Sequence, residues 1–290
     1  MVKQIILFYK YCVGYPKFTD IKKGMVIAML PGVYSACRKN GMSYYRASIT
    51  YLGKHISLGS YSTELKAHKA YTLAGQVLAP SSRWNIENYP SSCLLPFHKW
   101  IVLMNVRDNR IYIKNPIYIQ KRYFLYYIDR DTALKFDAED LFYYARHKIS
   151  KRGGHLFTTE YGMQINLLSR YGIKNYAVPG RDFLFVNGDN TDYRYSNIEV
   201  INSYHGVSRF FKKGLPVYQS RIHINGDYII GRYKTQEEAA IAYNKAAHLL
   251  KDKGLNKNFP ENYIDGMDAI TYAAIYQRLR ISQKIKDLII

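Results

Sequence analysis

The clearest pattern along the chain is a series of short alternating hydrophobic and polar runs, separated by glycine turns, that leads into an alanine-rich stretch. It occurs twice, once from Gly32 to Leu78 and again from Gly206 onwards. Alternating runs between glycine turns predict an antiparallel sheet, here of three strands. Alanines at helical spacing predict a helix that lies close to that sheet. We therefore predict an internal repeat whose unit is a small sheet covered by one helix.

The two copies match most closely where the sheet ends and the helix begins. Four residues recur at one constant offset: Gly59 and Gly231, Thr63 and Thr235, Ala67 and Ala239, and Tyr71 and Tyr243. Each threonine stands just before the helical periodicity, which predicts that its side chain caps the helix N-terminus. Each tyrosine comes one turn after its alanine and is predicted to fill the interface between sheet and helix.

The rest of the chain completes an α+β organisation, in which two small three-stranded antiparallel sheet-plus-helix modules flank a mixed α+β middle domain. The predicted parts are an N-terminal arm (1–30), a first module (31–80), the middle domain (90–202), a second module (205–260) and a C-terminal helical tail (261–290). Serine- and proline-rich stretches around residues 80 and 90 indicate the linker. The apolar start of the arm is interrupted by lysines and lacks a cleavage site, so it is not predicted to be a signal peptide.

Within the middle domain the pattern predicts strands over 100–106 and 110–119 and helices over 137–149 and 163–170. A further strand is predicted to begin at Phe183 and to enter a polar turn. In the tail, four apolar positions are predicted to pack on another domain: Ile270, Ala273, Ala274 and Leu279.

Composition restricts the class of protein. The chain has 290 residues, of which 48% are hydrophobic, enough for packed cores, and its formal charge of +20 favours a polyanionic partner. No run reaches the roughly 18 apolar residues of a membrane helix.

The three cysteines, Cys12, Cys37 and Cys93, are too far apart in the sequence to predict a metal site, and their sparse use is typical of a reducing cytoplasm. No nucleotide-binding loop or nucleophile motif appears, so we expect no cofactor, metal or small-molecule substrate.

The basic residues are concentrated on the predicted sheets. From Gly206 to Lys234 there are six Lys and Arg residues against one acid, Asp227, and from Gly32 to Tyr61 there are four against none. The acidic residues lie on the predicted helices instead. This placement predicts that the sheets face a phosphate lattice and that the helices face away from it.

The second copy resembles the DNA-binding domain of the Apetala-two/ethylene-response-factor family. The resemblance covers about 55 residues and is carried by Gly206-Val207, the strand from Tyr218 to Ile222, the run from Gly231 to Thr235, the following helix and Asn258-Phe259-Pro260. The first copy is looser, since it lacks the Asn-Phe-Pro sequence. In this family the sheet enters the major groove, so the resemblance implies double-stranded DNA as partner. The tryptophan common in the plant members is absent, and Tyr45 and Tyr218 stand near its place.

The resemblance and the charge placement together define the candidate DNA-binding residues. The resemblance implies base or phosphate contacts for Arg46, Arg209, Arg221 and Arg232, with Tyr45, His55, Tyr218 and His223 beside them. Charge placement and the middle domain add the remaining candidates: Arg38, Lys39, Lys54, Arg194, Lys212, Lys213 and Lys234.

The end of the middle domain resembles the second half of the HNH homing-endonuclease motif, in Asn187-Gly188-Asp189, Asp192, Arg194 and Asn197-Ile198-Glu199. The two histidine positions of that motif fall on Leu184 and Phe185. Those histidines bind the metal and activate water, so the resemblance implies a degenerate nuclease domain kept for DNA binding or as a spacer.

Three functions follow from these observations. The first is a sequence-selective, non-enzymatic DNA-binding protein of the cytoplasm, from a phage, a mobile element or a bacterial regulatory system. The second is an active HNH-type endonuclease that nicks DNA with a divalent metal. The third is an inhibitor that docks on a nucleoprotein complex through its basic face.

Overall fold

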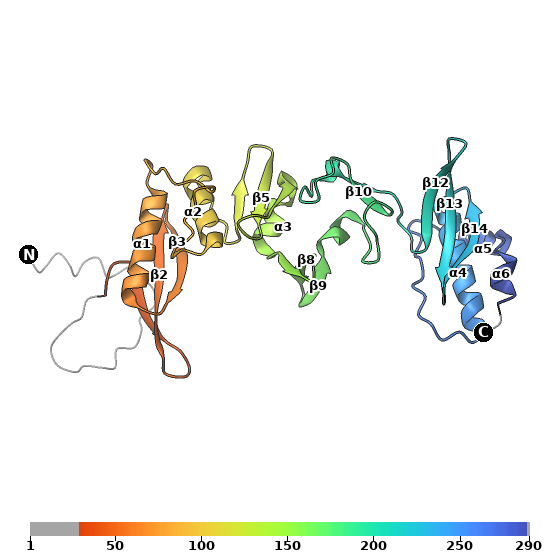
Figure 1. Ribbon diagram of the computed structural model, residues 1–290, viewed down its shortest axis with the longest axis horizontal. Helices are drawn as coiled ribbons and strands as arrows, with labels where there is room; N and C mark the ends of the chain where they lie inside the picture. Colours follow the sequence, from red (N-terminus) through yellow and green to blue (C-terminus); the bar gives the residue numbers. More distant parts are fainter. Residues whose placement is uncertain (1–28, 289–290) are drawn as a thin grey trace, which may run out of the picture.

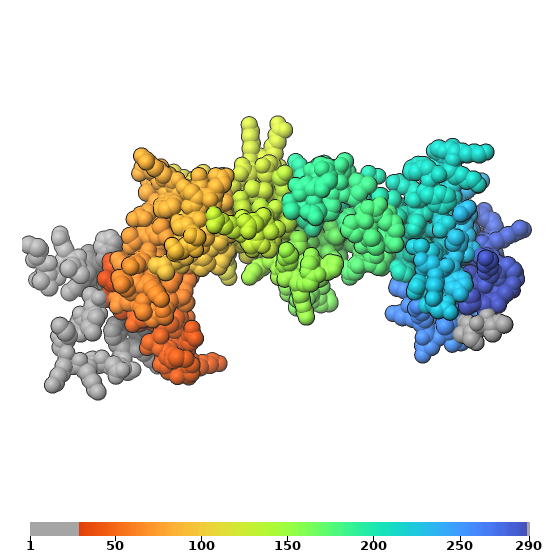
Figure 2. Space-filling view, in the orientation of Figure 1, coloured from red at the N-terminus to blue at the C-terminus, as the bar shows by residue number. Residues whose placement is uncertain are grey.

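The computed structural model describes residues 29–288, so the predicted N-terminal arm lies outside the described residues except for its last positions. The protein is elongated, with a sheet-plus-helix module toward each end and smaller sheets between them (Figures 1 and 2). The predicted α+β class is confirmed. Among the described residues, no helix combines the length and the apolar character that a membrane crossing requires.

The first module is an antiparallel sheet with one helix across it. Its elements are β1 (Val33–Cys37), β2 (Ser43–Tyr51), β3 (Lys54–Tyr61) and α1 (Glu64–Leu78), with the strands in the order β1-β2-β3. The predicted cap is present, because the side chain of Thr63 accepts a hydrogen bond from the backbone N–H of Lys66. The alanines of the helix that face the sheet are fully buried: Ala67, Ala70 and Ala74.

The second module repeats this arrangement. Its elements are β12 (Val207–Lys212), β13 (Leu215–His223), β14 (Asp227–Tyr233) and α4 (Gln236–Asp252), again with the strands in chain order. Thr235 accepts a hydrogen bond from the N–H of Glu238 at the start of α4. The internal repeat predicted from the sequence is thus present in the structure, down to its helix caps.

Both sheets also carry the same irregularity. The register shifts between Ala47 and Ser48 in the first module and between Ser220 and Arg221 in the second. After the shift, the N–H of Ser48 donates to the carbonyl of Gly32 at 3.1 Å, and the N–H of Arg221 donates to the carbonyl of Gly206 at 2.8 Å. A β-bulge at an equivalent place bends each sheet over its helix.

The glycine that opens each sheet lies directly against a tyrosine of the helix. Gly206 has φ +72, and a Cβ atom there would be 2.5 Å from both the Arg221 carbonyl oxygen and Cδ2 of Tyr243. Gly32 faces Tyr71 in the same way. Only glycine permits this approach, so the pair fixes the distance between the first strand and the helix.

The segment after the first helix contains a difference from the sequence prediction. Residues 100–106 are part of helix α2 (Phe97–Asn109), where a strand was predicted. All seven of these residues are buried, so the helix has no exposed polar face over this stretch, and its sequence is apolar except for Asn105. Trp100 and Leu103 belong to the same core as α1, so the first module extends past the linker predicted near residue 80.

The middle domain consists of short strands and turns around its own core. The elements are β4 (Ile117–Ile119), β5 (Tyr123–Tyr127), β6 (Ala133–Asp137), η2 (Ala138–Asp140), α3 (Leu141–Arg146), β7 (Ser150–Arg152), β8 (His155–Glu160), β9 (Met163–Asn166), η3 (Leu167–Tyr171), β10 (Phe183–Phe185), η4 (Tyr195–Asn197) and β11 (Ile198–Val200). The predicted helix over 163–170 is wrong in its first half, which forms β9. Of the strand predicted over 110–119, only β4 is extended in a sheet.

The C-terminal tail is helical as predicted, but it packs through a different side. Helices α5 (Ala269–Arg278) and α6 (Gln283–Lys286) complete the core of the second module. Ile270, Ala273 and Ala274 are exposed, whereas Leu279 is buried as predicted. The side of α5 that packs on the core is aromatic and β-branched, consisting of Tyr272, Ile275 and Tyr276.

We expect Gly206→Ala to destabilise the second module strongly, by about 2–4 kcal/mol, because the added methyl meets backbone as well as the Tyr243 ring and the φ angle is positive. Hydrogen exchange of the amides in α4 measures this loss. Gly214→Ala is the matched control, since Gly214 has φ +78 but nothing within 4 Å of the position that an added methyl would take. Equal destabilisation by both variants would show that backbone strain alone, without the close approach, accounts for the glycine.

Candidate nucleic-acid interface

Each three-stranded sheet has one face against its helix and one face turned away. In the first module, Val33 pairs with Ala47 on the helix side, where both are buried, while their neighbours Tyr34 and Arg46 pair on the opposite side. We call this opposite side the outward face of the first module. It is formed by Tyr34, Ala36, Arg38, Tyr44, Arg46, Ser48, Thr50, His55, Ser57 and Ser60.

Two arginines flank a tyrosine on this outward face. The guanidinium carbons of Arg38 and Arg46 lie 5.8 and 5.4 Å from the centre of the Tyr44 ring, and Nη2 of Arg46 donates a hydrogen bond to the Tyr44 hydroxyl at 2.7 Å. Cation–π contacts of this kind hold the guanidinium groups in place while leaving most of their N–H donors free. The cluster therefore presents oriented donors to an acceptor in solution.

The outward face of the first module carries no carboxylate. Residues 29–63 contain neither Asp nor Glu. Within the described part of the chain, neither Arg38 nor Arg46 forms an ion pair. A basic surface with nothing to neutralise it attracts anions over a Debye length of about 10 Å at moderate salt.

The outward face of the second module is built on the same pattern but has a different charge balance. It is formed by Ser208, Phe210, Lys212, Leu215, Val217, Gln219, Arg221, His223, Asp227, Ile229 and Arg232. Arg232 lies 5.4 Å from the Phe210 ring centre, and its Nε donates to Oε1 of Gln219 at 3.3 Å. Arg232 thus rests against an aromatic ring as Arg46 does in the first module, but it projects from β14 and not from the middle strand.

Arg221, in contrast, is paired with a carboxylate. Its Nη1 lies 3.0 Å from Oδ2 of Asp227, and Nδ1 of His223 lies 2.9 Å from Oδ1 of the same residue. The hydrogen bond from His223 and the charge of Arg221 hold the pKa of Asp227 below its usual value. Asp227 is consequently ionised at neutral pH and cancels part of the positive charge on this face.

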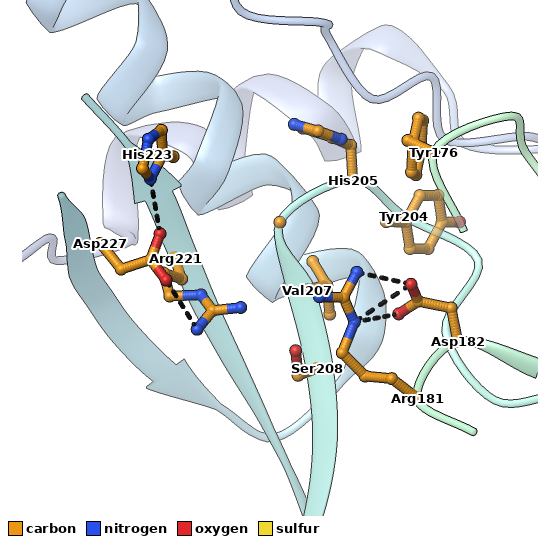
Figure 3. Close-up of a pocket in the computed structure, with 11 residues that line it drawn as sticks. Tyr176, Arg181, Asp182, Tyr204, His205, Val207, Ser208, Arg221, His223 and Asp227 are labelled. Atoms are coloured by element: carbon orange, nitrogen blue, oxygen red, sulfur yellow. Dashed lines mark hydrogen bonds and ion pairs between the residues drawn. The ribbon is translucent and has the colours of Figure 1, made fainter. Parts of the chain in front are cut away.

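A pocket of about 290 Å³ adjoins this face, between the second module and the end of the middle domain (Figure 3). Figure 3 shows two ion pairs at its wall, Arg221 with Asp227 and Arg181 with Asp182. His205 lines the pocket as well, and burial together with Arg181 lowers its pKa, so it is neutral at pH 7. Two acids thus balance two arginines at the wall of the pocket.

Three candidate residues lie on the helix side of the sheets and not on the outward faces. Tyr45 and Tyr218 lie on the helix side and pack against the two cores. Arg209 pairs with Tyr218 across the sheet, so it also points to the helix side, where it lies 3.6 Å from Glu199. Strand alternation decides the direction of all three side chains.

The other candidates from the two modules lie at the outward faces or at their ends. Arg38, Arg46 and His55 point outward in the first module. Arg221, His223 and Arg232 point outward in the second, at other positions of the repeat. Lysines stand at the turns and strand ends: Lys39, Lys54, Lys212, Lys213 and Lys234. The outward faces also contain Tyr34, Tyr44, Phe210 and Gln219, which were not among the residues predicted from the sequence.

The loop between β10 and β11, which resembles the HNH motif, is organised around a buried carboxylate. Asp192 is fully buried, and Arg194 holds it with two hydrogen bonds of 2.8 and 2.6 Å. Lys135 approaches it to 3.7 Å from β6, and Asn187 donates to it at 3.2 Å. Arg194, a candidate DNA contact, is therefore held in an internal ion pair.

The same loop, all of it within the described residues, gathers no set of possible metal ligands. Among residues 29–288, no three His, Cys, Asp or Glu side chains come together in a way that could hold a metal ion. Leu184 and Phe185, at the two histidine positions of the motif, belong to the β10–β11 pair, where they face Glu199 and Ile198. The contact between Lys135 and Asp192 joins β6 to the loop of the β10–β11 pair.

Comparison with known proteins gives no match: no protein-family model, no curated protein and no solved structure is similar to this chain. The resemblances to the Apetala-two domain and to the HNH motif thus stay predictions that rest on the residues quoted for them.

We expect Asp192→Asn to destabilise the middle domain by about 2–3 kcal/mol, because it leaves Arg194 and Lys135 without their anion, although both remain partly solvated. Burial alone would raise the pKa of Asp192, but the hydrogen bonds from Arg194 outweigh it and the pKa is lowered. The stabilisation is thus complete above the unfolded-state pKa and is lost as the pH falls through the lowered folded-state value.

Hydrogen exchange of the amides in β10 and β11 at several pH values measures this effect. The control is Glu139→Gln, which removes the same charge from an exposed position in the same domain. If Asp192→Asn leaves exchange unchanged at pH 7, the ion pairs do not hold this loop.

Proposed function

We propose that the chain is a non-enzymatic protein that binds double-stranded DNA through the outward faces of its two modules. The observation that carries the proposal is the outward face of the first module, where Arg38, Tyr44 and Arg46 form an exposed, oriented cluster on a surface without carboxylates. The second module offers the same kind of face through Arg221 and Arg232. The charge of +20 supports a polyanion as the partner.

Duplex DNA fits these faces better than a featureless polyanion does. A three-stranded face of this width suits the major groove, about 12 Å wide, and arginine forks match the acceptor pair of guanine. Serine and threonine hydroxyls beside the arginines on β2 and β3 supply further donors and acceptors for base edges. The resemblance to the Apetala-two domain points to the same docking mode, and we therefore expect the protein in the compartment that holds its DNA, the cytoplasm.

Fluorescence anisotropy with labelled duplexes tests the proposal. Binding to a duplex should weaken as salt increases, by roughly one unit of log slope for each phosphate contacted. Selection from random duplexes then determines whether the faces prefer a sequence. The absence of binding at low salt, or a response that is flat in salt, would overturn the proposal.

We expect Arg46→Ala to weaken binding by roughly 1–3 kcal/mol if the guanidinium reads a base edge, and to relax the preference at one base position. The measurement is the dissociation constant on the selected duplex and on variants with single base changes.

Lys69→Ala is the matched control, because it removes the same unit charge from an exposed position on helix α1 of the same module. If the two variants lose the same affinity, charge alone explains the effect and the outward face has no special role. An equal loss from Arg46→Ala on every sequence would assign Arg46 to phosphate contact.

We expect Asp227→Asn to strengthen DNA binding roughly fivefold at low salt, since it removes a negative charge that now pairs with Arg221. The gain should shrink as salt increases. Glu199→Gln removes an equal charge that pairs with Arg209 on the helix side, and it should change affinity less. Weaker binding by Asp227→Asn would mean that Asp227 positions Arg221 for contact.

A further inference from the structure

The outward face of the second module carries four large apolar side chains. Phe210 and Val217 pair across β12 and β13, Leu215 lies two residues before Val217 on the same side of β13, and Ile229 pairs with Arg221. Leu215 is 70% exposed and Ile229 is 48% exposed, and all four lie outside the core of the module. Exposed apolar groups on one face indicate a surface that contacts another molecule.

The first module has smaller residues at two of the corresponding positions. Ile229 stands opposite the residue that follows the β-bulge, and Ser57 has that position in the first module. Phe210 stands three residues after the buried valine of the first strand, and Ala36 has that position in the first module. Since the two modules share one fold, the larger apolar residues of the second are not needed for the fold.

Polar residues lie between the apolar ones. The row formed by Ser208, Gln219 and Arg232 separates Ile229 from Phe210 and its partner. A surface that docks on a protein is typically one contiguous apolar patch. The floor of the DNA major groove instead alternates hydrogen-bonding groups with the methyl group of thymine. The alternation on this face therefore fits the groove better than it fits a protein.

The charge beside the apolar residues also favours DNA as the partner. Lys212 pairs with Leu215 at the end of the face, and the guanidinium carbon of Arg232 lies 5.4 Å from the Phe210 ring centre. Residues 200–226 contain no Asp or Glu. Phosphates attract such basic residues, and the apolar side chains between them are then left to meet the base edges.

We propose that Phe210, Val217 and Ile229 contact thymine methyl groups in the major groove, so that the second module selects sites that contain thymine. This inference rests on the proposed DNA binding and names the base that one of its two faces prefers. Among the residues named for the first outward face there is no Val, Leu, Ile or Phe. The first module therefore does not share this preference.

Deoxyuridine tests the inference, because it pairs as thymidine does but lacks the methyl group. Fluorescence anisotropy measures the affinity of the full chain for the most tightly bound duplex from the selection. Each thymidine of that duplex is replaced in turn by deoxyuridine. We expect affinity to fall about fourfold at each thymidine that the face contacts, which is the effect of exposing one buried methyl group. Affinity should not change at the other thymidines.

Two variants assign the effect to the outward face. Ile229→Ser and Phe210→Ala each introduce the residue that the first module has at the same position, so both are compatible with the fold. Each should bind the thymidine duplex more weakly and should lose the response to deoxyuridine at the base that its side chain contacts. Phe211→Ala is the matched control, since Phe211 is 66% exposed but lies on the helix side of β12, and it should keep the full response.

The outcomes separate this inference from DNA binding itself. If no deoxyuridine replacement changes the affinity, or if the selected duplex lacks thymidine, the methyl contacts are overturned and DNA binding stands. A full response retained in both Ile229→Ser and Phe210→Ala would overturn them too. Variants that alter only self-association would assign the face to a second copy of the chain. Failure of the unaltered chain to bind any duplex would remove the proposed function as well.

Discussion

The close approach of one glycine to one tyrosine determines how each module is built. Gly206 lies against Tyr243 and the Arg221 carbonyl, and Gly32 lies against Tyr71. A side chain at either glycine would push the first strand off the helix. Because the strand is held so close, the small alanines of the helix can fill the interface, and the central residues on that side of the sheets are buried, among them Ile56, Leu58, Ile222 and Ile230. The other side of the sheet is then left for polar and aromatic residues that the fold does not need.

The two modules use this free side differently. In the first, Arg38 and Arg46 are held by the Tyr44 ring and hydroxyl, so their charge stays available. In the second, Asp227 takes up the charge of Arg221, while Arg232 rests on Phe210. Under the proposed function, the first face supplies most of the long-range attraction. The second depends more on contacts made at short distance, where Asp227 can be displaced from Arg221 by phosphate.

Much of the fold could be predicted from the sequence because the same pattern of strands, turns and helix occurs in two copies. Thr63 and Thr235 cap their helices, and the alanines lie on the sheets as expected. Helix α2 could not be predicted, since a helix buried all round loses the polar face that gives its period. The direction of the Arg209 side chain could be predicted, because Arg209 lies two residues after the apolar Val207 and therefore on the same side of the strand. For Tyr44 and Tyr45 it was not, because two identical neighbours carry no signal of which one is buried.

The elongated arrangement sets how the two faces can act together (Figure 1). Linked modules gain affinity only when the connecting segment lets both engage one duplex, and the gain falls steeply when it cannot. Here the connection is a folded domain whose terminal loop is locked by Asp192 to Lys135 and Arg194. A folded connection has less conformational freedom to lose on binding than a flexible linker of the same span. On the proposed function, it also restricts the spacing of the two contacts, so the middle domain would act as a spacer between sites without needing chemistry of its own.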